Sequence, residues 1–136
     1  MAILHTIGAL AGGIVRVTVP SLNHAQRRSI IRATDSAIQA VQRRDVAAHG
    51  AARWALVEQF AASCPNPVLI CATQQAIIAL AHRLTRAEFR DAIDAPATIG
   101  HTSREYRTLR AAVDVGDAVT AEQAMQRAFR LPGRTP

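Results

Sequence analysis

Signals for helix starts and helix ends recur along the whole sequence, and they limit the fold more strongly than any other feature. The strongest start signal is Asn66 followed by Pro67, an N-cap residue before a proline at the first helical position. Pro65 ends the preceding segment, because a residue that precedes proline avoids the helical conformation. Between such signals apolar residues recur at helical spacing, and the connections are short. This pattern predicts a bundle of antiparallel helices.

Two predicted helices lie between the N-terminal segment and this break. Asn23 and Gln26 have the spacing of a capping box, which opens a helix that extends to about Arg44. A second helix is predicted over Val46–Ser63.

Further start and stop signals follow downstream. Two more capping boxes are predicted, Thr85 with Glu88 and Thr102 with Glu105. Pro96 closes the short segment that the first box opens. Gly116 is a left-handed C-cap for the helix that the second box opens, and Asp117 caps a last helix.

The N-terminal segment carries conflicting signals. Residues 14–19 are a strand-like run rich in β-branched side chains, and Gly8, Gly12 and Gly13 disfavour a helix. A single strand would have no partner elsewhere in the chain. We therefore expect a helix here that packs closely at its glycines.

Length and composition favour one soluble domain over residues 1–136. The 136 residues are 49% hydrophobic, which excludes an intrinsically disordered chain. No apolar run is long enough to span a membrane, no secretory signal is evident, and two cysteines cannot form a disulfide scaffold. We expect an all-α antiparallel bundle of about six to seven helices in the cytoplasm.

The chain is basic, with a net charge of +6, and all 16 basic residues are arginine. Such a balance invites a nucleic-acid interpretation. The arginines are spread along the sequence, however, and no aromatic residues are interleaved with them. Solvated helix faces are therefore favoured over direct nucleic-acid binding.

Motifs for catalysis are absent from the sequence. It contains no glycine-rich phosphate loop and no nucleophile elbow, so an enzyme is not expected. Asp45 and His49 are four residues apart, as in half of a metal site. We interpret this pair as an exposed contact on a helix surface.

Two stretches carry a family resemblance. The first combines residues 54–60 (WALVEQF) with 65–69 (PNPVL), and the second is 105–113 (EYRTLRAAV) with the later pairs Gly116-Asp117 and Ala124-Met125. Their order and spacing resemble the FCD domain, the C-terminal effector domain of the FadR subfamily of GntR-type transcription regulators. The resemblance covers the chain from about Leu22 onward. It implies a helical bundle that encloses a small-molecule pocket and dimerises.

The resemblance also implies a site. Many members hold a divalent metal through one Asp and three His, and the corresponding positions here are Arg53, Val57, Tyr106 and Ala128. None carries a metal ligand of the expected type, so we expect no metal and no cofactor. Our hypothesis is that these four positions line a ligand pocket in which Arg53 clamps a carboxylate, with the Tyr106 hydroxyl as a second donor.

Two alternatives remain at this point. In the first, Arg53 points outward or pairs with Glu105 or Asp45, and core residues fill the cavity. The function expected from the resemblance is sensing of a small acidic effector by a homodimeric regulator domain, with DNA bound only through a winged-helix domain that this chain lacks. The second alternative concerns this function: the chain is instead a structural or interaction bundle with a vestigial pocket, which pairs with other regulator subunits.

Overall fold

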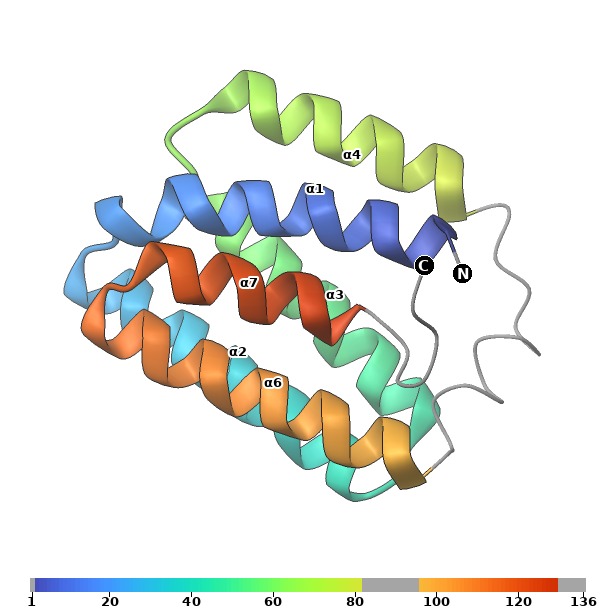
Figure 1. Cartoon of the computed structure of the whole chain (residues 1–136). Coiled ribbons are helices and arrows are strands. Elements are labelled where there is room, and N and C mark those ends of the chain that lie inside the picture. The colour runs from blue at the N-terminus through green and yellow to red at the C-terminus, as the bar shows by residue number, and fades with distance from the viewer. Residues whose placement is uncertain (1, 82–95, 130–136) are drawn as a thin grey trace.

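The computed structural model describes residues 2–81 and 96–129, and these residues form six α-helices and no strand (Figure 1). The helices are α1 (Ala2–Thr18), α2 (His24–Gln42), α3 (Val46–Ser63), α4 (Pro67–Ala81), α6 (Pro96–Val115) and α7 (Ala118–Ala128). A short 3₁₀ turn, η1 (Val19–Ser21), joins α1 to α2. The predicted all-α fold is confirmed.

The helices pack around one hydrophobic core. Helix α7 lies between α1 and α6, and α2 packs against both α3 and α6 (Figure 1). The largest apolar side chains buried in this core include Ile7, Ile30, Leu56, Phe60 and Leu109. Helix α4 lies on the outer side of α1, away from α2 and α6 (Figure 1). It therefore covers the bundle on one side only.

The predicted caps fix three helix starts. The Asn23 side chain accepts from the Gln26 N–H at 2.8 Å, and the Gln26 side chain accepts from the Asn23 N–H at 2.9 Å. Asn66 Oδ1 accepts two backbone N–H bonds at the start of α4, and the Asp117 carboxylate caps α7. Gly116 has φ +77°, the left-handed conformation predicted for it.

The predicted helix start at Thr102 is wrong. Helix α6 begins at Pro96, and both Thr102 and Glu105 are buried inside it. Pro96 opens this helix instead of closing a segment, because a proline fits the first helical turn, where no N–H partner is needed. The other predicted box, Thr85 with Glu88, lies outside the described residues.

The N-terminal segment is a helix, as expected, and α1 extends through residues 14–18. Two of its glycines allow close packing against α7. A Cβ added at Gly8 would lie 2.8 Å from the Phe129 Cβ, and one at Gly12 would lie 2.8 Å from the Gln126 side chain. Gly13 faces open space. Tight contact between α1 and α7 therefore explains Gly8 and Gly12.

Within residues 2–81 and 96–129, no helix combines the length and the apolar character that crossing a membrane requires.

Candidate functional site

One face of α3 carries a stripe of buried residues that includes polar side chains. His49, Arg53 and Val57 follow one another at intervals of four residues, which places them on the same side of the helix. Their exposed fractions are only 1%, 5% and 6%. Asp45 starts the helix, with its carboxylate accepting from the Ala48 N–H at 3.0 Å. The chain thus carries a guanidinium and an imidazole into the bundle interior.

Arg53 connects α3 to α6 and α7. Its Nε donates to the Tyr106 hydroxyl at 3.1 Å, and its Nη2 donates to the Ala128 carbonyl at 3.4 Å. The guanidinium carbon lies 4.6 Å from the centre of the Phe129 ring, in the arrangement of a cation–π contact. Tyr106 is fully buried. Residues far apart in the sequence therefore meet around one cationic group.

His49 completes the cluster, and its partners determine where its proton lies. Its Nε2 is 3.0 Å from the Tyr106 hydroxyl and 3.4 Å from Arg53 Nη2. Arginine can only donate, and the Tyr106 oxygen already accepts from Arg53, so the hydroxyl hydrogen is available for Nε2. Nε2 thus accepts, and the neutral ring carries its hydrogen on Nδ1. That buried Nδ1 has no hydrogen-bond partner among the described residues.

Burial controls the charge of His49. Loss of solvent, followed by the positive charge of Arg53, lowers the pKa of His49 from 6.5 to about 3. The imidazole is therefore neutral near pH 7, which agrees with its role as an acceptor from Tyr106 and Arg53.

Of the four predicted pocket residues, the structure joins three by hydrogen bonds and places the fourth, Val57, in the hydrophobic core. Arg53, Tyr106 and the backbone carbonyl of Ala128 are joined by hydrogen bonds. Val57 lies one turn further along the same stripe of α3 and belongs to the hydrophobic core. The alternative that Arg53 points outward is wrong, because the guanidinium is buried against α6 and α7.

His49 is the residue that the sequence interpretation missed. We expected it to make an exposed contact with Asp45, but it is 1% exposed and contacts Tyr106 across the bundle. Its ring meets the Tyr106 ring edge to face, with centroids 5.8 Å apart. The available signal was its spacing of four residues from Arg53, which predicts a shared helix face.

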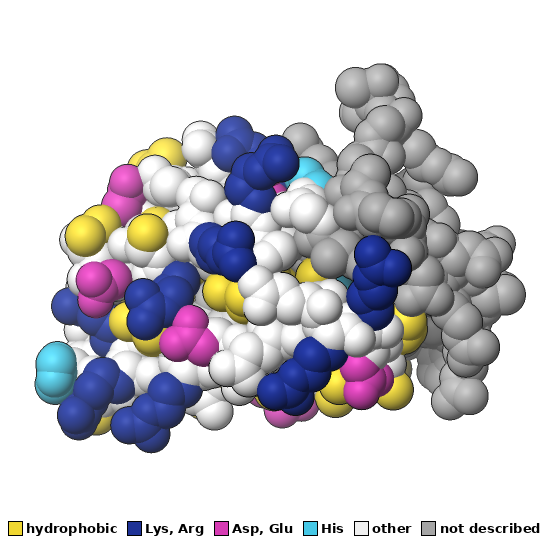
Figure 2. All heavy atoms as spheres, turned by 90° about the horizontal axis from the view of Figure 1, so that it is seen from below, with side chains coloured by type: hydrophobic (Ala, Val, Ile, Leu, Met, Phe, Trp, Pro, Cys, Tyr) yellow, Lys and Arg dark blue, Asp and Glu magenta, His cyan; other side chains and the backbone are white. Residues whose placement is uncertain are grey.

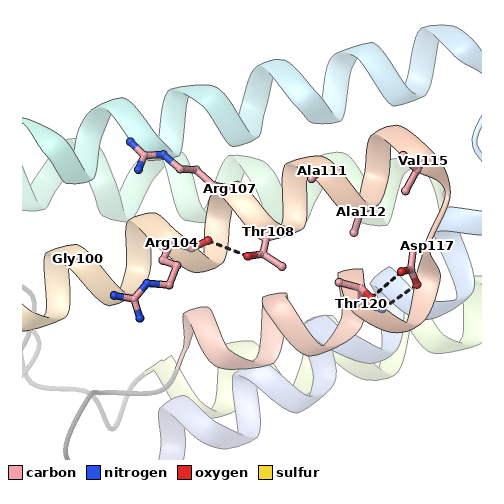
Figure 3. Close-up of a pocket in the computed structure, with 9 residues that line it drawn as sticks. All are labelled: Gly100, Arg104, Arg107, Thr108, Ala111, Ala112, Val115, Asp117 and Thr120. Carbon is pink, nitrogen blue, oxygen red and sulfur yellow. Dashed lines mark hydrogen bonds between the residues drawn. The ribbon is translucent and has the colours of Figure 1, made fainter.

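A separate groove of about 730 Å³ lies on the outer surface between α6 and α7 (Figure 3). Arg104, Arg107 and Val115 are among the α6 residues that line it. At one end the Thr120 hydroxyl and N–H donate to the Asp117 carboxylate and lower its pKa. None of the four predicted pocket residues lines this groove.

Comparison with protein families decides the relationship that the two sequence stretches suggested. The family model of the FCD domain matches residues 2–131, nearly the whole chain. This chain belongs to the FCD domain family. No curated protein and no solved structure matches it. The FCD domain is an effector-binding regulatory domain of GntR-type regulators and not a catalytic family, so its interior cluster is a candidate effector site.

The donor groups of this FCD domain do not suit the family's divalent metal. Within the described residues, no group of three or more His, Cys, Asp and Glu side chains could hold a metal ion. His49 Nε2 already accepts hydrogen bonds, and the Arg53 guanidinium lies 3.4 Å from it. A cation bound at Nε2 would meet a second positive charge at close range. The cluster therefore provides donors and a positive charge, which suit an anion.

Proposed function

We propose that this domain senses a small organic acid in the bundle interior, with Arg53 and Tyr106 as donors and without a metal. One observation carries the proposal: the Arg53 guanidinium and the Tyr106 hydroxyl meet at 3.1 Å in the core. Both stand at positions where the family resemblance places metal ligands. A fixed guanidinium supplies positive charge where many relatives use a metal.

The lengths of the Arg53 contacts indicate how an acid would enter. The bond from Nε to Tyr106 has ordinary length, whereas the two from Nη2 to His49 and to the Ala128 carbonyl are long at 3.4 Å. A carboxylate accepts shorter and stronger bonds from a guanidinium than neutral groups do. An acid can therefore replace the two long contacts while Tyr106 keeps the side chain in position.

The test is a binding measurement with defined carboxylates. Purified protein is titrated with mono-, di- and hydroxycarboxylates and with their neutral amides, by calorimetry and by thermal shift. We expect at least one acid to bind and its amide to fail. Arg53→Met should weaken this binding at least tenfold, and Arg53→Lys should restore only part of it because lysine lacks the planar fork.

A matched variant distinguishes loss of the Arg53 site from loss of one positive charge anywhere on the protein. Arg107→Met also removes one positive charge, but from the exposed surface of α6, and it should leave acid binding unchanged. Equal binding by the parent and Arg53→Met would contradict the proposal. So would native mass spectrometry that finds stoichiometric zinc or nickel in the parent protein.

A second candidate function is a structural bundle with a vestigial pocket, which pairs with other regulator subunits. It is favoured by the internal contacts of the cluster, because Arg53 already has the Tyr106 hydroxyl, His49 Nε2 and the Ala128 carbonyl as hydrogen-bond partners. Failure of every acid to bind or to raise the melting temperature would favour this function.

We also propose that the domain forms a homodimer through the outer face of α4. This face consists of Val68, Cys71, Ala72, Gln75 and Ile78, all exposed at helical spacing. Val68 and Ile78 are 76% and 63% exposed, and α4 contains no charged residue. Leu69 and Thr73 lie on the opposite face, toward the bundle. An uncharged helix with one apolar face open to water is typical of an interface.

The assembly test uses two equally exposed valines. Val68 on α4 and Val115 on α6 are both 76% exposed. Light scattering after size exclusion should give a dimer for the parent and for Val115→Glu, and a monomer for Val68→Glu combined with Ile78→Glu. A dimer in the α4 variant, or a monomeric parent protein, would contradict this interface.

A further inference from the structure

The fold gathers the arginines that are dispersed in the sequence. Seven exposed arginines lie on α2, on α6 and in the turn after α2: Arg28, Arg32, Arg43, Arg44, Arg104, Arg107 and Arg110. Four acidic residues accompany them: Asp35, Asp45, Asp114 and Asp117, the last in the same groove as Arg104 and Arg107. The basic face is our name for this surface. The rest of the described surface carries Arg16 and Arg127 against Glu58 and Glu122. The positive excess among these exposed residues therefore lies on α2, on α6 and in the turn after α2.

The basic face is continuous because its two helices pack side by side. Arg110 on α6 binds Asp35 on α2 at 2.8 Å, directly across the line where the helices meet. Figure 2 views the molecule from this side and shows arginine side chains spread over it. Arg28 and Arg43 are 15 residues apart on α2 and its C-cap, which corresponds to about 22 Å along a helix axis. The face is thus long enough to meet several phosphates.

We propose that the basic face binds the backbone of double-stranded DNA without reading its sequence. A duplex carries about one negative charge per 1.7 Å with both strands counted, so a 22 Å length of duplex carries about 13 charges, some of which face the protein. Contacts to phosphates hold the duplex but carry no sequence information. This inference rests on surface charge and not on the effector site.

Two observations favour a duplex over other polyanions. Single strands are held largely by stacking on aromatic side chains. Within the described residues, Phe60, Tyr106 and Phe129 are buried and Trp54 is half-buried against the core on α3, so no exposed aromatic residue is available. An acidic protein would also meet positive charge here, but the FCD domain is a regulatory domain of GntR-type transcription regulators, and DNA is the polyanion on which such regulators act.

The experiment compares two variants of equal net charge. Arg32→Gln with Arg107→Gln removes two charges from the basic face, and Arg16→Gln with Arg127→Gln removes two from exposed positions on α1 and α7. Each protein is titrated against a labelled 25-base-pair duplex of unrelated sequence by fluorescence anisotropy, between 50 and 200 mM salt. Circular dichroism melting checks that each variant is folded.

We expect the parent protein to bind the duplex with an affinity that falls steeply with salt. Loss of two phosphate contacts should reduce the slope of log K against log salt by about 2 and weaken binding about tenfold or more in 50 mM salt. The control pair should change the affinity less than threefold.

Three results would overturn the proposal. The first is an absence of duplex binding at 50 mM salt, and the second is equal weakening by the two pairs. The third is preference for another polyanion, seen as tighter binding of a single strand or as displacement of the duplex by polyglutamate at equal charge. Acid binding by Arg53 is measured with different ligands and different variants, so failure of duplex binding leaves the proposed effector site untouched, and the reverse also holds.

Discussion

Arg53 and Tyr106 are 53 residues apart in the sequence, and Arg53 Nε donates to the Tyr106 hydroxyl at 3.1 Å in the core of the bundle. The same hydroxyl lies 3.0 Å from His49 Nε2. The Tyr106 oxygen is therefore a hydrogen-bond partner of both Arg53 and His49. Without this hydroxyl, both polar side chains would face the apolar edge of the ring. The stability of the bundle and the candidate effector site therefore depend on the same group.

Tyr106→Phe should destabilise the protein by about 1–3 kcal/mol, because it leaves buried polar groups of Arg53 and His49 without this partner. Urea unfolding followed by circular dichroism measures the change. The control is a double-mutant cycle with Arg53→Met. In that background Tyr106→Phe should cost less, with a coupling energy of about 0.5–3 kcal/mol. Additive effects of the two substitutions would show that the contact contributes nothing.

Stability should fall with acid through His49. The folded pKa of about 3 lies below the unfolded value of 6.5, so below pH 6.5 the unfolded chain takes up a proton that the folded protein does not. The full stability is present above pH 6.5 and is lost as the pH falls toward 3. At pH 5 the loss from this group is about 2 kcal/mol relative to pH 7.5.

The pH measurement needs a variant that does not titrate. His49→Gln keeps a polar side chain without a proton equilibrium in this range, so its unfolding free energy should fall less between pH 7.5 and pH 5 than that of the parent. His24→Gln changes an exposed histidine at the start of α2 and should retain the parent's pH profile. Parallel profiles for the parent and His49→Gln would refute the assignment.

Two glycines of α1 should respond in opposite directions to the same substitution. Gly8→Ala places a Cβ 2.8 Å from the Phe129 Cβ and 3.2 Å from the Gln126 carbonyl, which should cost about 1–3 kcal/mol. Gly13→Ala meets nothing within 4 Å and should stabilise the helix by up to about 1 kcal/mol. Thermal melts of the two variants test the packing of α1 on α7. A stable Gly8→Ala protein would argue against it.

Gly116 tests the left-handed cap between α6 and α7. Its φ of +77° disfavours a side chain, so Gly116→Ala should lower the stability by about 1–2 kcal/mol although the added Cβ has open space. Gly116→Asn should cost less, because asparagine tolerates this conformation better. Equal melting temperatures for the alanine variant and the parent would contradict the cap.

Several helix boundaries could be predicted because caps are local chemistry. The bonds of Asn23 with Gln26, and of Asp117 with Thr120, join residues only three apart, so their geometry depends little on the rest of the chain. The same pattern failed at Thr102 and Glu105. There a longer helix from Pro96 buries both residues, and tertiary packing outweighs the local signal.

The site was only partly predictable for a related reason. The spacing of His49 and Arg53 places them on one face of α3, but spacing cannot decide whether that face meets solvent or a partner. The face is buried because Tyr106 of α6 packs against it: its hydroxyl accepts a hydrogen bond from Arg53 and contacts His49. The arginines, likewise, looked dispersed until the packing of α2 on α6 placed them on one surface.

The sequence alone thus determined most of the helical segments, where several of them start and stop, and that the chain resembles the FCD domain. Those features depend on interactions within a few residues or on residue identity. The tertiary structure decided that His49 is buried and neutral, that Arg53 points inward and that one face is basic. These outcomes depend on which helix faces meet, and that requires contacts between residues far apart in the chain.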